Sequence, residues 1–239
     1  MPSTLSPLHE LGWLLRRPSV LLTLALLAGI ATFKGLVFSR IVQAPITERT
    51  EIYGGLLVGI EALVFYACQF LLARKLGRNE APLRPRWVLW IVALILFVLI
   101  WRIWTFAFTL AVLDSVSRAA LPYVSQAGRF VWSVFSLPFE VWVVALAIGH
   151  RGAAMGTVMR RFFSSAAILL GWYALLLFAA RIIPILVMAG ATVLGNRDAA
   201  PAIAAVLAIL RLAVELLYPI AAYRVTAAPA EAGVDQVFD

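Results

Sequence analysis

The sequence has few of the residues from which catalytic and metal sites are usually built. It contains one cysteine, Cys68, and two histidines, His9 and His150, which are far apart in the chain. A single cysteine excludes an internal disulfide and a cysteine-based metal site. Two distant histidines are a poor basis for a metal or haem site. Zinc-protease, serine-hydrolase and phosphate-loop motifs are absent. We therefore expect no cofactor, no metal and no enzymatic activity.

Charged residues are also scarce, at 13% of the 239 residues against 63% apolar residues. The mean hydropathy is +0.96, whereas ordinary soluble domains are about half apolar. Six long apolar stretches each reach the roughly 20 residues that a helix needs to cross a bilayer. They cover residues 19–39, 54–73, 88–113, 130–149, 163–190 and 201–223. We predict an all-α, polytopic membrane protein with six transmembrane helices in one bundle.

The two ends of the chain differ from the apolar middle. In residues 1–17, Leu8, Leu11 and Leu15 recur at helical spacing beside Trp13. This pattern predicts a short amphipathic helix at the membrane interface, with a simple anchoring tail as the alternative. Residues 18–224 form the six-span domain in this interpretation. Residues 225–239 are Ala-rich and then acidic, which predicts a disordered cytoplasmic tail.

The distribution of basic residues predicts the topology. Eleven basic residues lie in the N-terminal tail, in the second and fourth connections and in the C-terminal tail, whereas five lie in the other three connections. Basic segments stay in the cytoplasm, so both termini are expected there. The predominance of Arg over Lys, together with the Ala and Leu content, suggests a bacterial source, and we expect the protein to lie in the inner membrane. The net charge of +8 is explained by contact with anionic lipid headgroups, and nucleic acid is not an expected partner.

Seven ionisable residues lie inside the predicted spans, where such residues are costly and often functional. Lys34 lies near a span end and can extend to the headgroups. The other six occupy similar depths, and Arg211 and Glu215 are four residues apart on one helix face. We take these six as a polar interior: Glu61, Arg102, Glu140, Arg181, Arg211 and Glu215.

Two functions are consistent with this interior. A small transporter or permease-like component would use the acidic residues for protons or cations and the arginines for anions or charge balance. A non-transporting scaffold or accessory subunit would use the same residues as buried Arg–Glu pairs that fix helix registry. The lipid bilayer is the expected partner, together with a membrane-protein partner or a second copy of the chain. The sequence does not identify a substrate.

Three local features lead to further expectations. Pro138, Pro184 and Pro219 should interrupt their helices, as in transport sites with broken helices. The GxxxG pair Gly55 and Gly59 should form a helix-packing face. Residues 150–162 are expected to form a cationic loop on lipid. The alternative is a short helix of the kind that docks an ATPase, but the acidic residue and the Leu-Pro pair of that motif are missing.

Overall fold

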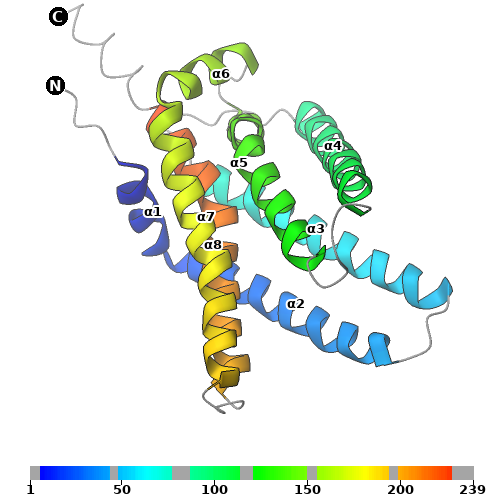
Figure 1. The fold of residues 1–239 in the computed structure, drawn as a ribbon. Coiled ribbons are helices and arrows are strands. Elements are labelled where there is room, and N and C mark those ends of the chain that lie inside the picture. Colours follow the sequence, from blue (N-terminus) through cyan, green and yellow to red (C-terminus); the bar gives the residue numbers. More distant parts are fainter. Residues whose placement is uncertain are drawn as a thin grey trace, which may run out of the picture.

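The computed structural model describes residues 6–43, 48–76, 87–113, 121–149, 155–193 and 199–227. Over these residues the chain is helical and contains no strand. The described helices are α1 (Pro7–Leu15), α2 (Pro18–Gln43), α3 (Glu48–Leu76), α4 (Trp87–Leu113), α5 (Leu121–Ile148), α6 (Met155–Ser164), α7 (Ala166–Val193) and α8 (Ala199–Ala227). Figure 1 shows their arrangement. The all-α prediction is confirmed.

Helix α1 begins at a strong local signal. The Ser6 hydroxyl accepts a hydrogen bond from the backbone N–H of Leu8 (3.3 Å), and Pro7 occupies the first turn. Both features are typical of helix starts. The helix ends before Arg17, whose position ahead of Pro18 disfavours helical geometry. The chain then bends by 81° into α2. An amphipathic helix is therefore present within the predicted segment 1–17.

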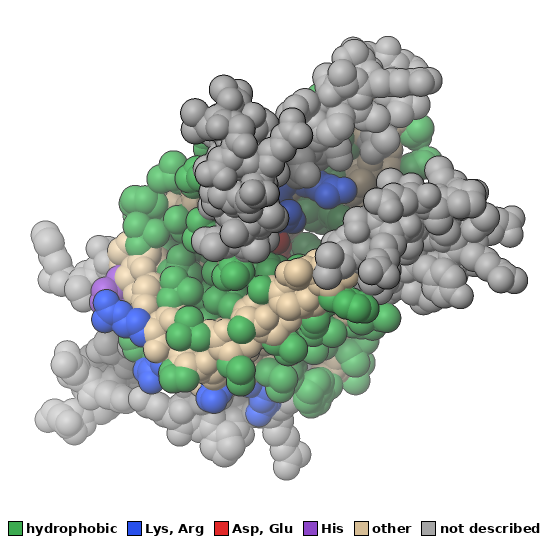
Figure 2. Space-filling view, turned by 90° about the horizontal axis from the view of Figure 1, so that it is seen from below, with side chains coloured by type: hydrophobic (Ala, Val, Ile, Leu, Met, Phe, Trp, Pro, Cys, Tyr) green, Lys and Arg blue, Asp and Glu red, His purple; other side chains and the backbone are tan. Residues whose placement is uncertain are grey.

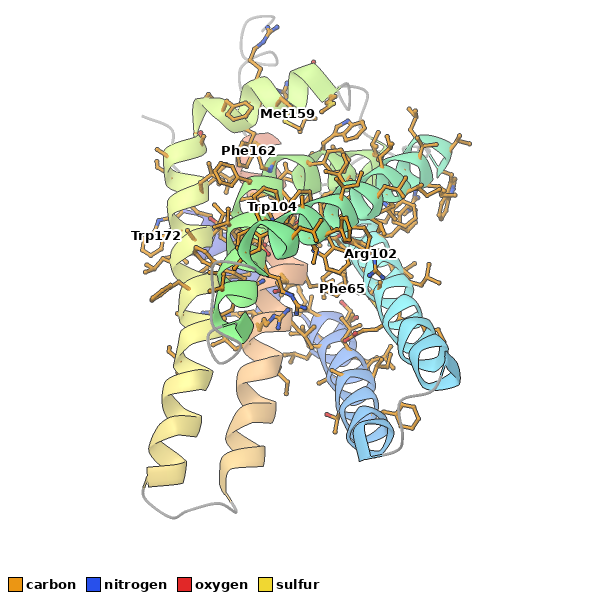
Figure 3. All side chains as sticks on the ribbon, turned by 45° about the vertical axis from the view of Figure 1, so that its right-hand side comes forward. Phe65, Arg102, Trp104, Met159, Phe162 and Trp172 are labelled. Atoms are coloured by element: carbon orange, nitrogen blue, oxygen red, sulfur yellow. The ribbon has the colours of Figure 1, made fainter. Side chains whose placement is uncertain are left out.

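Helix α6 lies where a loop was expected, and it corrects that part of the prediction. Its Val158 and Phe162 are buried one turn apart, while Arg160 and Phe163 are exposed. This spacing makes one face apolar. Helix α6 meets α7 at Ser165 with a bend of 81°, so the predicted stretch 163–190 does not form one straight helix. Figure 3 shows α6 across the end of the bundle.

The last two helices form the centre of the packing. Helices α7 and α8 run side by side (Figure 1), and α8 also contacts α1, α2, α3, α5 and α6. Leu137 on α5, Leu177 on α7 and Leu217 on α8 are fully buried. Helix α4 packs on α5 at the edge of the structure. The core therefore lies between α5, α7 and α8.

Helix α4 has a largely apolar exposed surface. Between Val88 and Ile100 every side chain of this helix is apolar, and most of these side chains are exposed. Two segments, Trp87–Val112 of α4 and Ala127–Ile148 of α5, are long and apolar enough to cross a membrane. The number rises from two to four if α1–α2 and α6–α7 each count as one bent span. These helices support a membrane protein with several spans, and the full six are not established by this criterion.

Two of the local expectations are not met. Pro138 lies within the continuous helix α5 and Pro219 within the continuous helix α8. Proline is tolerated inside membrane helices because neighbouring groups satisfy the freed carbonyl. Gly59 does not form a close packing face, since a Cβ added there would meet no atom within 4 Å. The side chain at position 55, like residues 150–154 and 228–239, lies outside the described residues.

Candidate functional site

Glu215 on α8 lies at the centre of a charged cluster between helices. Its Oε1 atom accepts a hydrogen bond from Arg211 Nε at 2.8 Å and another from Arg181 Nη2 at 3.2 Å. The first contact joins residues one turn apart on α8, as their spacing predicts. The second joins α7 to α8. Glu215 is therefore shared by two arginines from two helices.

Arg181 extends this cluster to a third helix. Its Nη2 atom also donates to the Ser133 hydroxyl on α5 at 3.1 Å. The Arg181 side chain is only 9% exposed, whereas that of Arg211 is 42% exposed. A guanidinium has five N–H donors in a rigid plane and can hold several acceptors at once. Arg181 therefore joins α5, α7 and α8, while Arg211 forms the more open side of the cluster.

Glu140 lies on α5 next to this ion-pair cluster but outside its salt bridges. Its Oε1 atom accepts a hydrogen bond from the Ser136 hydroxyl at 2.9 Å. The Ser136 hydroxyl also lies 3.1 Å from the carbonyl oxygen of Ser133, the residue that contacts Arg181. Glu140 and Glu215 repel each other electrostatically. Among the described residues, none of the salt bridges formed by Arg181 and Arg211 includes Glu140.

The third acidic residue reaches the cluster from α3. Glu61 is half-buried and attracts Arg211 electrostatically. Two tyrosines line the same region: Tyr66 on α3 and Tyr173 on α7 both lie near Glu140 and Glu215. Tyr173 is almost fully buried and stacks on Tyr218. The polar interior thus receives side chains from α3, α5, α7 and α8.

The structure brings five of the six predicted residues together and separates the sixth. Arg102 on α4 is exposed, and its guanidinium lies 5.3 Å from the ring centroid of Trp101. Figure 3 places it on the α4 side of the molecule, near Phe65. A distance of this size allows a weak cation–π contact. Arg102 is therefore at the periphery, and the side chain of Lys34 lies outside those the structure describes.

Four members of the interior were missed by the sequence analysis: Ser133, Ser136, Tyr66 and Tyr173. A signal for the two serines existed, because Ser133, Ser136 and Glu140 follow the three- and four-residue spacing of one helix face. Tyrosine gives no such signal, since its ring is common in apolar helices. We refer to the five charged residues of the interior, with Ser133 and Ser136, as the interior cluster.

Figure 2 shows a few basic and acidic atoms in the middle of the face seen from below. Hydrophobic side chains cover much of the surrounding described surface. Charged groups in an apolar surround interact more strongly than they would in water, so their arrangement has energetic consequences.

A second charged contact lies at the opposite end of α8. Arg224 Nε donates to Glu10 Oε2 on α1 at 2.5 Å. The guanidinium carbons of Arg17 and Arg224 lie 4.1 Å and 4.2 Å from the Trp13 ring centroid. These distances are within cation–π range. We refer to Glu10, Trp13 and Arg224 as the terminal clasp.

Comparison of the chain with family models, with curated proteins and with solved structures finds no match.

Proposed function

We propose that this chain is a small transporter or permease-like component of the bacterial inner membrane, with six spans and both termini in the cytoplasm. The interior cluster would line its path for an ion or small polar solute. The observation that carries the proposal is the convergence of Glu61, Glu140, Arg181, Arg211 and Glu215 from four helices of an apolar protein.

The energetic cost of this arrangement supports a path. Ionisable residues inside membrane proteins usually face the bundle interior or a water-filled cavity and often mark ion or substrate routes. The Arg211 side chain remains partly exposed, although the side chains of Arg181 and Glu215 are more buried. A set of charges that served only packing would gain nothing from this exposure. In a path through the cluster, the exposed guanidinium of Arg211 would contact the ion or solute that passes.

A non-transporting scaffold is the second candidate, and the contacts of Arg181 favour it. This residue holds Ser133 on α5 and Glu215 on α8 from its own position on α7. Buried ion pairs of this kind can fix which helices meet and in what register. In that case the interior would be closed, and a membrane-protein partner or second copy of the chain would carry the function.

Neutralising two acidic residues separates the candidates. Glu61→Gln and Glu140→Gln would be expressed, reconstituted in vesicles and assayed for charge movement on solid-supported membranes. The probes would be Na⁺, K⁺, Cl⁻ and proton gradients, with Arg102→Gln as the peripheral control. Transport predicts normal expression with altered charge movement in the two glutamate variants alone. A scaffold predicts poor folding instead. Normal expression with unchanged charge movement would contradict both functions.

The proposed topology has its own test. Cys68 is the only cysteine, so a Cys68→Ala background allows single cysteines to be placed in each connection. A membrane-impermeant thiol reagent applied to spheroplasts should label positions in 44–47, 114–120 and 194–198. It should not label positions in 77–86, 150–154 or 228–239. Labelling of adjacent connections from the same side would contradict six spans.

A further inference from the structure

We infer that Glu140 is a proton-carrying residue, which takes up and releases one proton inside the interior cluster. This inference rests on the proposed transport function, and it names the ion that the path would carry or use as a driving force.

The two arginines of the interior cluster both donate to one carboxylate. Arg181 and Arg211 each donate to the same oxygen atom of Glu215, at 3.2 Å and 2.8 Å. A carboxylate held by two charge-assisted hydrogen bonds is strongly favoured in its ionised form. Glu215 therefore takes both of these arginine contacts, and Glu140 takes neither of them.

Glu140 has the opposite surroundings. Its described hydrogen-bond partner is the neutral Ser136 hydroxyl, and the described residues include no basic side chain in salt-bridge contact with it. The negative charge of Glu215 acts on it as well. A charge inside a membrane protein that lacks a partner is costly. Addition of one proton removes that cost without disturbing the Arg–Glu pairs.

The described groups that interact with Glu140 are neutral or acidic, and the nearby arginines contact other residues. Helix α3 contributes Tyr66, α7 contributes Tyr173 and α8 contributes Glu215. On α4, which packs against α5, Phe97 stacks on Phe139 beside Glu140. The basic residue of α4, Arg102, is exposed next to Trp101. The buried basic residue of α7, Arg181, is held by Ser133 and Glu215.

A proton fits this site better than a metal cation does. Calcium takes about 6–8 oxygen ligands, and potassium filters surround the ion with carbonyl oxygens. Over the described residues, no group of three or more His, Cys, Asp or Glu side chains could hold a metal ion. A proton needs one oxygen atom. Hydronium would transfer a proton to a Glu140 carboxylate oxygen, leaving water and a neutral carboxylic acid, and the reverse step would return the proton to water.

Infrared difference spectroscopy tests the inference without any transport assay. The full-length protein in lipid nanodiscs would be compared between acidic and alkaline buffer, with and without ¹³C-labelled glutamate. We expect a carboxylic-acid C=O band that shifts on glutamate labelling, disappears in Glu140→Gln and persists in Glu215→Gln. The Gln side chain keeps an oxygen that can accept the Ser136 hydrogen bond. Glu140→Asp, which retains a carboxyl, should keep a band that no longer shifts on glutamate labelling.

The outcomes separate this inference from the proposed function. A glutamate band that is unchanged in Glu140→Gln, or absent from the unmodified protein at every pH, overturns the assignment of Glu140 even if vesicles transport ions. A band assigned to Glu140 in a protein that moves no charge supports the proton site and contradicts transport. If Glu140→Gln fails to fold, the position of the band in Glu140→Asp decides the assignment, and a band that still shifts on glutamate labelling overturns it.

Discussion

Glu10 and Arg224 are 214 positions apart in the sequence, yet they form an ion pair with a distance of 2.5 Å between Oε2 and Nε. Both side chains are largely buried, at 8% and 13% exposure. Trp13 lies against the same guanidinium and against that of Arg17. The first helix is therefore attached to the last turns of α8.

The terminal clasp should contribute measurably to stability. We expect Glu10→Gln and Arg224→Gln each to lower the free energy of unfolding by about 1–3 kcal/mol, because each leaves a poorly solvated charge without its partner. The double variant should cost less than the sum of the two. Unfolding in mixed detergent micelles, followed by tryptophan fluorescence, measures these values. Strict additivity would show that the pair does not interact.

Two stacked tyrosines provide a matched pair of substitutions. Tyr218 and Tyr173 have ring centroids 4.9 Å apart and are both buried. The Tyr218 hydroxyl donates to the Leu169 carbonyl oxygen at 2.7 Å. Tyr218→Phe should therefore lower the free energy of unfolding by about 1 kcal/mol. Both substitutions keep the aromatic ring, but Tyr173→Phe does not remove this hydrogen bond and should therefore lower the stability less. Equal losses in the two variants would contradict a specific role for the hydrogen bond.

The α4–α5 contact depends on a glycine. A Cβ at Gly128 would lie 2.6–2.9 Å from the Phe108 ring, whereas one at Gly171 would meet nothing within 4 Å. Trp104 Nε1 also donates to the Gly128 carbonyl oxygen at 3.3 Å. Gly128→Ala should cost about 1–3 kcal/mol through overpacking. Gly171→Ala should be neutral or stabilising by up to about 1 kcal/mol. Denaturation of both variants checks this, and a stable Gly128→Ala would contradict the close approach.

The helices were the most predictable part of the fold. A long apolar run in lipid must satisfy its backbone hydrogen bonds internally, so such a run specifies a helix. Four of the six predicted stretches lie within one helix; the stretch 130–149 runs one residue past the end of α5, and 163–190 is divided between α6 and α7. The sequence also predicted the contact between Arg211 and Glu215, because both residues lie on one helix. Local spacing was sufficient in these cases.

The direction in which a side chain faces was harder to predict. Counting from span ends placed Arg102 at the depth of the other charges, but depth says nothing about rotation around the helix axis. Helix α4 turns Arg102 outward beside Trp101. The contact of Arg181 with Ser133 joins residues 48 positions apart, and no local pattern contains that information. Packing between helices decides both outcomes.

The central claim is that charges from different helices meet inside the bundle, and the Arg181–Glu215 contact tests it most directly. A double-mutant cycle with Arg181→Gln and Glu215→Gln, measured by unfolding in mixed micelles, isolates their interaction. We expect a coupling of at least about 1 kcal/mol, with Arg102→Gln and Glu215→Gln as an additive control pair. Additive effects in the Arg181–Glu215 cycle would contradict the interior cluster.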